Sequence, residues 1–185
     1  MNVLLTSCGL ETKAIETAFM DMLPQQPENI KAIFIPTAAV SPDAIEVLPK
    51  CLNDLIKCGI KRENIYVYDL HELMENAELK LYDVIYLCGG DSKYLLRRIN
   101  ESGFDKRLKD FIEQGGVVVG VSAGSIIFAN NLENNLGLLQ CALKVHCADD
   151  ECEKAGYYTE CVKENINLGN KQAIILCDGG FTIIE

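Results

Sequence analysis

The chain has 185 residues, 49% of them hydrophobic, and a formal net charge of −10 at pH 7. This length and composition predict a single domain over residues 1–185 that buries a core of its own. The acidic balance argues against nucleic acid and anionic membrane surfaces as partners, because an acidic surface gains no counterion release from phosphates or lipid headgroups.

Apolar strand-like runs alternate with helical patterns, which predicts an α/β fold with a three-layer, mostly parallel, doubly wound sheet. In chain order, we expect strands at 3–7, 32–35, 65–68, 83–87, 116–121, 172–177 and 181–184. Helices are expected at 11–22 and 41–57, the second with a kink at Pro49, and amphipathic helices should separate the later strands. The Asp178-Gly-Gly180 turn predicts a hairpin between the last two strands. Periodicity fades over 130–170, which suggests a mobile or site-covering segment.

The nine cysteines are odd in number, and several lie inside strand-like runs, as Cys88 and Cys177 do. With no apolar leader and no run of about 18 apolar residues, this usage predicts a reduced, cytoplasmic protein whose thiols mostly fill the core. The cysteines at 141, 147, 152 and 161 surround His146, but no Cys-x-x-Cys pair occurs and their spacing fits no zinc module. We therefore expect neither a metal nor a cofactor.

The most informative segment spans residues 115–129, where a buried-strand pattern ends in Gly120-Val-Ser-Ala-Gly124 and continues as an apolar helix. This is the layout of a nucleophile elbow, in which small flanking residues let the chain turn sharply and leave the serine hydroxyl clear of the sheet. Ser122 is therefore the predicted nucleophile.

A second glycine-rich turn follows the strand at 83–87, in Cys88-Gly-Gly-Asp-Ser92. Open parallel sheets bind ligands at the carboxyl ends of their strands, so this turn should lie near Ser122. An N–H group of the glycine pair, together with that of Ala123, could form an oxyanion hole. The alternative is that the turn only starts a helix capped by Asp91 or Ser92.

A serine nucleophile needs a base, and the chain has two histidines, His71 and His146. His71 lies in a polar helical opening at 69–74 and is expected at the surface. His146 ends a short extended run after the elbow, which suits a base carried on a later loop. A carboxylate should orient its imidazole, and several are available. We choose Asp178, because it should project from the same sheet edge as Ser122. The alternatives are Glu133, Asp149, Asp150 and Glu151.

These segments resemble the peptidase E group of serine peptidases (family S51), which includes dipeptidase E and the cyanophycinases. The resemblance rests on Leu5-Thr-Ser-Cys-Gly9, Tyr86-Leu-Cys-Gly-Gly-Asp-Ser-Lys-Tyr-Leu-Leu96, Gly120-Val-Ser-Ala-Gly-Ser125, and Leu136-Gly-Leu-Leu139 leading to His146. It implies a flavodoxin-like fold similar to class I glutamine amidotransferases, with serine in place of their cysteine nucleophile. It also implies Ser122 as nucleophile, His146 as base, Gly90 and Ala123 as oxyanion donors, and hydrolysis of peptides that begin with aspartate.

Two features depart from the family pattern. The segment between Ser125 and Leu136 is short and contains Glu133 but no aspartate. No arginine follows Arg107, and residues 147–152 are acidic where relatives with dipeptidase activity tend to carry arginines for a substrate carboxylate.

We predict a serine-type peptidase or dipeptidase that acts on small peptides through an acyl-enzyme, with a homodimer as a possible assembly. The alternative is a non-catalytic relative that keeps the elbow for structural reasons and binds a small metabolite or a protein partner. A third interpretation is a thiol-dependent amidotransferase that uses Cys88 or Cys8, although neither cysteine occupies the elbow.

Overall fold

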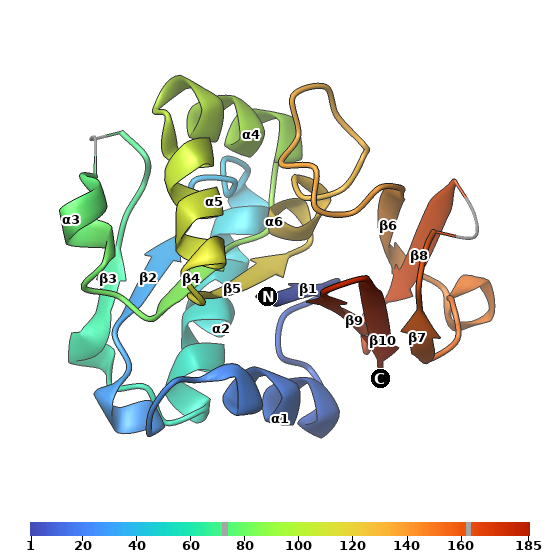
Figure 1. Ribbon diagram of the computed structural model, residues 1–185, viewed down its shortest axis with the longest axis horizontal. Helices are drawn as coiled ribbons and strands as arrows, with labels where there is room; N and C mark the ends of the chain where they lie inside the picture. The colour runs from blue at the N-terminus through green and yellow to red at the C-terminus, as the bar shows by residue number, and fades with distance from the viewer. Residues whose placement is uncertain (72–73, 162–163) are drawn as a thin grey trace.

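The computed structural model describes residues 1–71, 74–161 and 164–185 (Figure 1). Residues 72–73, which belong to the helical opening expected at 69–74, lie outside the described residues.

The centre of the molecule is an eight-stranded sheet in the order β3-β2-β4-β5-β1-β9-β10-β7. Its parallel part consists of β3 (Ile65–Val67), β2 (Ala32–Ile35), β4 (Val84–Leu87), β5 (Val117–Val121) and β1 (Asn2–Thr6). The sheet continues through antiparallel pairings with β9 (Ala173–Cys177), β10 (Gly180–Ile184) and β7 (Gly156–Tyr158). The predicted α/β class and the final hairpin are confirmed.

A second, two-stranded parallel sheet pairs β6 (Ala142–Cys147) with β8 (Asn165–Gly169). A short 3-10 turn, Asp149–Glu151, follows β6. These elements and β7 lie within 130–170, where the sequence predicted little regular structure beyond an extended run at 142–146. The strands are short and carry polar residues, so their hydrophobic period is too weak to identify them.

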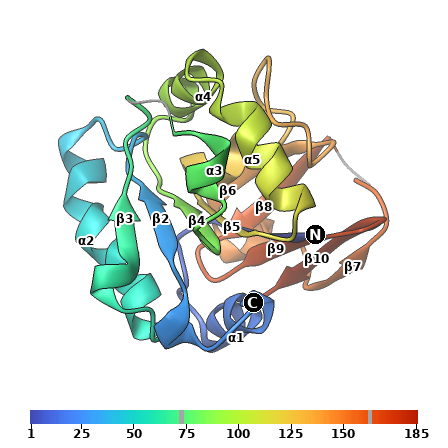
Figure 2. The same cartoon turned by 60° about the vertical axis from the view of Figure 1, so that its left-hand side comes forward.

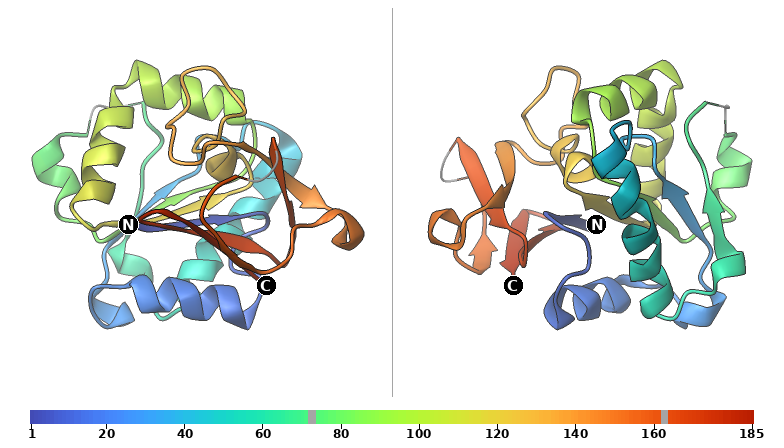
Figure 3. Two further views of the ribbon diagram at one scale, coloured as in Figure 1. Left: turned by 45° about the vertical axis from the view of Figure 1, so that its right-hand side comes forward. Right: turned by 180° about the vertical axis from the view of Figure 1, so that it is seen from behind.

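Helices cover both faces of the central sheet (Figures 2 and 3). On one face lie α1 (Lys13–Met22) and α2 (Pro42–Lys57), and on the other lie α3 (Asn76–Leu79), α4 (Ser92–Glu101) and α5 (Phe104–Glu113). Short 3-10 turns at Pro27–Asn29 and Arg62–Asn64 precede β2 and β3. The four-residue helix α6 (Ala123–Ile126) directly follows β5.

The parallel strands are stable in this position because both of their faces are apolar. Every residue of β2, β4 and β5 is buried, and one apolar cluster packs on each side of the sheet. Phe19 and Leu55 pack under α1 and α2, whereas Leu95 and Leu108 pack under α4 and α5. Ser41 caps α2 through the N–H of Ala44, and the helix continues through Pro49. The result is a rigid layer that holds the carboxyl ends of β4, β5 and β1 side by side.

Candidate active site

Ser122 lies in the sharp turn between β5 and α6, as the elbow pattern predicts. Its backbone has φ 49° and ψ −106°, a conformation that costs energy for a residue with a side chain. Two glycines make the turn possible, because a Cβ at Gly120 would meet the Gly124 carbonyl at 2.5 Å and one at Gly124 would collide with the Leu87 carbonyl of β4. The Ser122 N–H donates to the Thr6 carbonyl at 3.0 Å, which ties the turn to β1.

His146 presents its imidazole to this hydroxyl. The distance from Nε2 to Ser122 Oγ is 3.0 Å, within hydrogen-bond range. His146 has φ 59°, and the pairing of β6 with β8 shifts register between Lys144 and Cys147. Such a bulge redirects a side chain out of the regular strand alternation, and here the redirected ring contacts the elbow.

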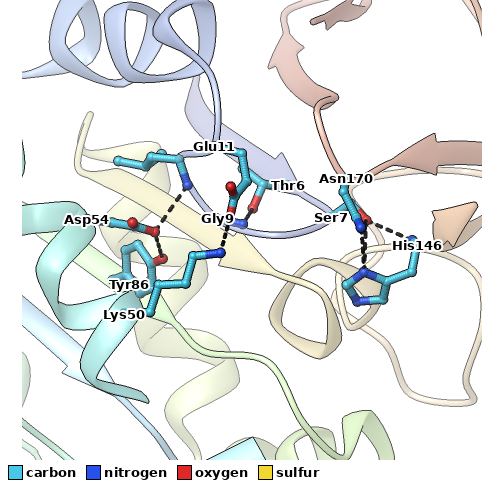
Figure 4. Close-up of polar contacts among 10 residues, drawn as sticks. Thr6, Ser7, Gly9, Glu11, Lys50, Asp54, Tyr86, His146 and Asn170 are labelled. Carbon is cyan, nitrogen blue, oxygen red and sulfur yellow. Dashed lines mark hydrogen bonds and ion pairs between the residues drawn. The ribbon is translucent and has the colours of Figure 1, made fainter. Parts of the chain in front are cut away.

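Asn170, just after β8, holds the other side of the imidazole. Its Oδ1 lies 2.7 Å from His146 Nδ1 and 3.4 Å from the Ser7 hydroxyl, and that hydroxyl accepts the His146 backbone N–H at 2.7 Å. Figure 4 shows Ser7, His146 and Asn170 together beside the end of β1. A proton on Nδ1 donated to Asn170 leaves the Nε2 lone pair free to face Ser122, the tautomer that a general base needs.

Sequence reasoning missed both Asn170 and Ser7. The search for an orienting group considered only carboxylates, whereas an amide oxygen also accepts a hydrogen bond from an imidazole. The sequence signal for Ser7 was its position at the carboxyl end of a predicted strand. In the structure Ser7 is 0% exposed.

The structure does not bring Asp178 to the imidazole, so our choice for the orienting acid needs correction. Asp178 lies in the turn between β9 and β10, its side chain is 92% exposed, and Oδ1 is 3.9 Å from the Met1 amino group. The reason is strand direction. Because β9 is antiparallel to β1, with Val3 opposite Leu176, the end of β9 lies at the amino edge of the sheet, opposite the edge that carries Ser122.

The alternative carboxylates make no described hydrogen bond to the imidazole. Glu133, Asp149, Asp150 and Glu151 are all exposed, and within the described residues none of them hydrogen-bonds His146. His71 is exposed, as expected, and its Nδ1 lies 3.3 Å from Nη2 of Arg98.

Gly90 lines the cavity beside Ser122, and Ala123 directly follows the serine at the start of α6. Gly90 has φ 137°, and a Cβ there would collide with the Ala38 carbonyl, so only glycine fits. Ala123 opens α6, where the first N–H groups of a helix have no intrahelical acceptor. Across the part of the chain that the structure describes, neither N–H is bonded to a backbone or side-chain acceptor. Asp91 does cap α4 through the N–H of Tyr94, so the turn both starts a helix and leaves these donors available.

A buried polar cluster under α2 supports the segment that follows β1 (Figure 4). The Asp54 carboxylate accepts the Leu10 N–H at 3.1 Å and the Tyr86 hydroxyl at 2.9 Å. Burial raises the pKa of Asp54, although these two hydrogen bonds partly oppose the shift. Lys50 pairs with Glu11 at the surface above the cluster. These contacts fix the segment that carries Ser7.

The cysteines differ in part from the expected set of reduced thiols. Cys141 and Cys161 form a disulfide, and seven other cysteines are free. Burial raises the pKa of Cys88 well above its usual value and also raises the pKa of Cys8. These shifts disfavour the thiolate form that a cysteine nucleophile needs, and Nε2 of His146 faces Ser122 instead. Among the described residues, no cluster of three or more His, Cys, Asp or Glu side chains could hold a metal ion.

No helix in the described ranges has the length and apolar character needed to cross a bilayer.

Comparison with known proteins places these features in one family. The model of the family described as Peptidase family S51 matches residues 3–184. An uncharacterized peptidase of Listeria innocua is 28% identical over 136 residues, which cover 71% of this chain and 61% of that protein. Peptidase E of Shigella sonnei is 29% identical over 125 residues, which cover 66% of this chain and 52% of that protein. The matched region thus spans less than two thirds of either relative.

Solved structures show the same fold. A candidate peptidase E protein from Listeria monocytogenes superimposes with a TM-score of 0.75 at 20% identity, covering 100% of this chain and 98% of that chain. A peptidase from an acI-B1 actinobacterium gives a TM-score of 0.66 at 16% identity, with coverage of 98% and 86%.

Proposed function

Because the chain belongs to peptidase family S51, we propose that it is a serine hydrolase that cleaves small peptides through an acyl-enzyme. The observation that carries this proposal is the 3.0 Å contact between His146 Nε2 and the hydroxyl of Ser122 in its strained turn. This distance between Ser122 Oγ and His146 Nε2 is within the range over which a general base accepts a proton.

The first half of the reaction forms the acyl-enzyme. Ser122 Oγ attacks the carbonyl carbon of the scissile bond as His146 Nε2 takes the hydroxyl proton. The negative oxygen of the tetrahedral intermediate accepts hydrogen bonds from the N–H groups of Gly90 and Ala123, and each such donor contributes about 10²–10³ in kcat. The imidazolium then gives its proton to the leaving amine as the C–N bond breaks, which leaves an ester on Ser122.

The second half returns the enzyme to its starting state. A water molecule attacks the ester carbonyl as His146 Nε2 removes its proton, and the same two N–H groups hold the second oxyanion. The C–O bond to Ser122 then breaks, the serine oxygen regains a proton from the imidazolium, and the acid product leaves. In both halves Asn170 acts as a positioning residue, because its Oδ1 keeps the imidazole in the tautomer that presents a lone pair at Nε2.

Covalent labelling tests the proposal. A fluorophosphonate probe should modify wild-type protein at Ser122, as identified by mass spectrometry, and Ser122→Ala and His146→Ala should abolish labelling. Two variants serve as controls: Ser102→Ala removes a hydroxyl at the end of α4, and Cys8→Ala removes one of the two thiols that the amidotransferase interpretation invokes. Both should label like wild type.

The same experiment addresses the non-catalytic alternative. A relative that keeps the elbow only for structural reasons would show no labelling by the probe and no hydrolysis of any peptide, with Ser122→Ala indistinguishable from wild type. A single domain over 1–185, a homodimer and a cytoplasmic location stay predictions.

A further inference from the structure

Beside Ser122 lies a cavity of about 210 Å³ that reaches from His146 to helix α2. Pockets for whole drug-sized ligands are larger, about 300–1,000 Å³, so this one suits a single side chain. The wall facing the catalytic pair is one stripe of α2, formed by Ala44, Val47, Leu48 and Cys51. Their spacing of three, four and seven places them on the same helix face.

Among the described residues that line this cavity, His146 carries the one basic side chain, and it already contacts Ser122. Cys51 and Cys88, 6% and 1% exposed, also line the cavity, and neither can contribute a positive charge. The nearby ammonium group of Lys50 is paired with Glu11, and Asp54 lies buried on the same helix one turn beyond Cys51. A carboxylate bound here would lose its water without gaining a cation, which is strongly unfavourable.

The direction of the reaction assigns the cavity to the acyl side of the substrate. The leaving amine must face His146 Nε2 to receive its proton, so it occupies the side of Ser122 nearest the imidazole. The residue that supplies the carbonyl then extends the other way, toward α2. Figure 4 shows His146 and Asn170 on one side of the segment after β1 and Lys50 and Asp54 on the other.

We propose that the residue whose carbonyl is attacked carries a small, uncharged, apolar side chain, bound between Ser122 and the Ala44–Val47–Leu48 stripe of α2. This inference rests on the proposed function and names its substrate class. It departs from the aspartyl preference that the family resemblance implies, because the groups that would bind an aspartate are not in the cavity.

The test compares kcat/KM for aminoacyl p-nitroanilides that differ only in the side chain: alanine, valine, leucine, aspartate and lysine. The apolar members should exceed aspartate and lysine by about 100-fold or more, since a buried charge without a partner is costly. Equal or better hydrolysis of the aspartyl substrate would overturn the proposal. If Lys50→Met then abolished the aspartyl activity, Lys50 would be identified as a cation that binds the substrate despite its pairing with Glu11.

A charge introduced on the α2 stripe provides the second readout. Val47 is 46% exposed at the cavity, so Val47→Arg should fold and should raise the aspartate-to-alanine ratio of kcat/KM about tenfold or more. Ile45→Arg is the matched control, because Ile45 is 53% exposed on the same helix but does not line the cavity. An equal change in both variants would mean a general charge effect and would count against the site.

The fluorophosphonate probe separates this inference from the proposed function. Loss of both labelling and hydrolysis defeats the proposed function itself, and the inference with it. If Ser122 is labelled but every anilide is inert, the rates of labelling by alkyl and carboxyalkyl phosphonofluoridates replace the anilide series. Faster labelling by the alkyl probe supports the apolar cavity, and faster labelling by the carboxyalkyl probe overturns it.

Discussion

Asn170 gives the sharpest test of the site, because an amide occupies the position that a carboxylate takes in a Ser-His-Asp triad. Its Oδ1 lies 2.7 Å from His146 Nδ1. Asn170→Asp places a negative charge at the same distance, whereas Asn170→Ala removes the contact. The two variants should therefore move activity in opposite directions.

The expected change in kcat follows from the strength of the hydrogen bond between residue 170 and the His146 imidazole. A neutral hydrogen bond contributes about 0.5–1.5 kcal/mol and one to a charged group about 1.5–3 kcal/mol, so the carboxylate gains about 1–1.5 kcal/mol as the imidazolium forms. That difference corresponds to roughly a tenfold rise in kcat, and it is an upper figure because His146 and Asn170 are both exposed to water. Asn170→Ala should lower kcat by a similar factor.

The assay is a pH profile of kcat/KM for wild type and both variants. A carboxylate favours the imidazolium form, so the acidic limb should move to higher pH in Asn170→Asp. Asn29→Asp, in the 3-10 turn before β2, makes the same change in net charge far from the site and should leave the limb in place. Activity within twofold of wild type for both Asn170 variants, with an unmoved limb, would refute the positioning role.

Three further outcomes follow from single features. Gly90→Ala should lower kcat by about 10²–10³, since the new Cβ collides with the Ala38 carbonyl and displaces one oxyanion donor, and a lower midpoint in urea titrations should report the same strain. Burial raises the pKa of Asp54 above its usual 3.8. The contribution of Asp54 to stability is therefore complete below pH 3.8 and declines as the pH rises through the folded-state pKa. In urea titrations, Asp54→Asn should gain stability relative to wild type between about pH 4 and 7. Replacing Cys141 and Cys161 by serine should cost about 3 kcal/mol of unfolding free energy for a loop of 20 residues, and nine rather than seven thiols titrating in unreduced wild type would contradict the disulfide.

Local steric demands explain why the elbow could be predicted from sequence. Gly120 and Gly124 are required by contacts within five residues of Ser122 or with the adjacent strand β4. The parallel strands were equally readable, because burial on both faces gives continuous apolar runs such as 84–87 and 117–121. The same reasoning located His146 after the elbow but gave no distance to Ser122.

Strand direction is the feature that misled the prediction for the orienting acid. A hairpin at 173–184 could be predicted from its turn, but its pairing with β1 could not, because periodicity records which residues are buried and not which way a strand runs beside its neighbour. Reversing β9 moves Asp178 to the far edge of the sheet and leaves Asn170 to contact His146.

The α/β architecture, the elbow and its serine could therefore be predicted from the chain alone, because each depends on residues close together in the sequence. The surroundings of that serine depend on how distant segments pack. Ser7, Asn170 and the α2 stripe are far from Ser122 in sequence. Ser7 and Asn170 hold the His146 imidazole that faces Ser122, and the α2 stripe lines the cavity beside the serine. Long-range pairing of this kind depends on the packing of the whole sheet, which no local pattern records.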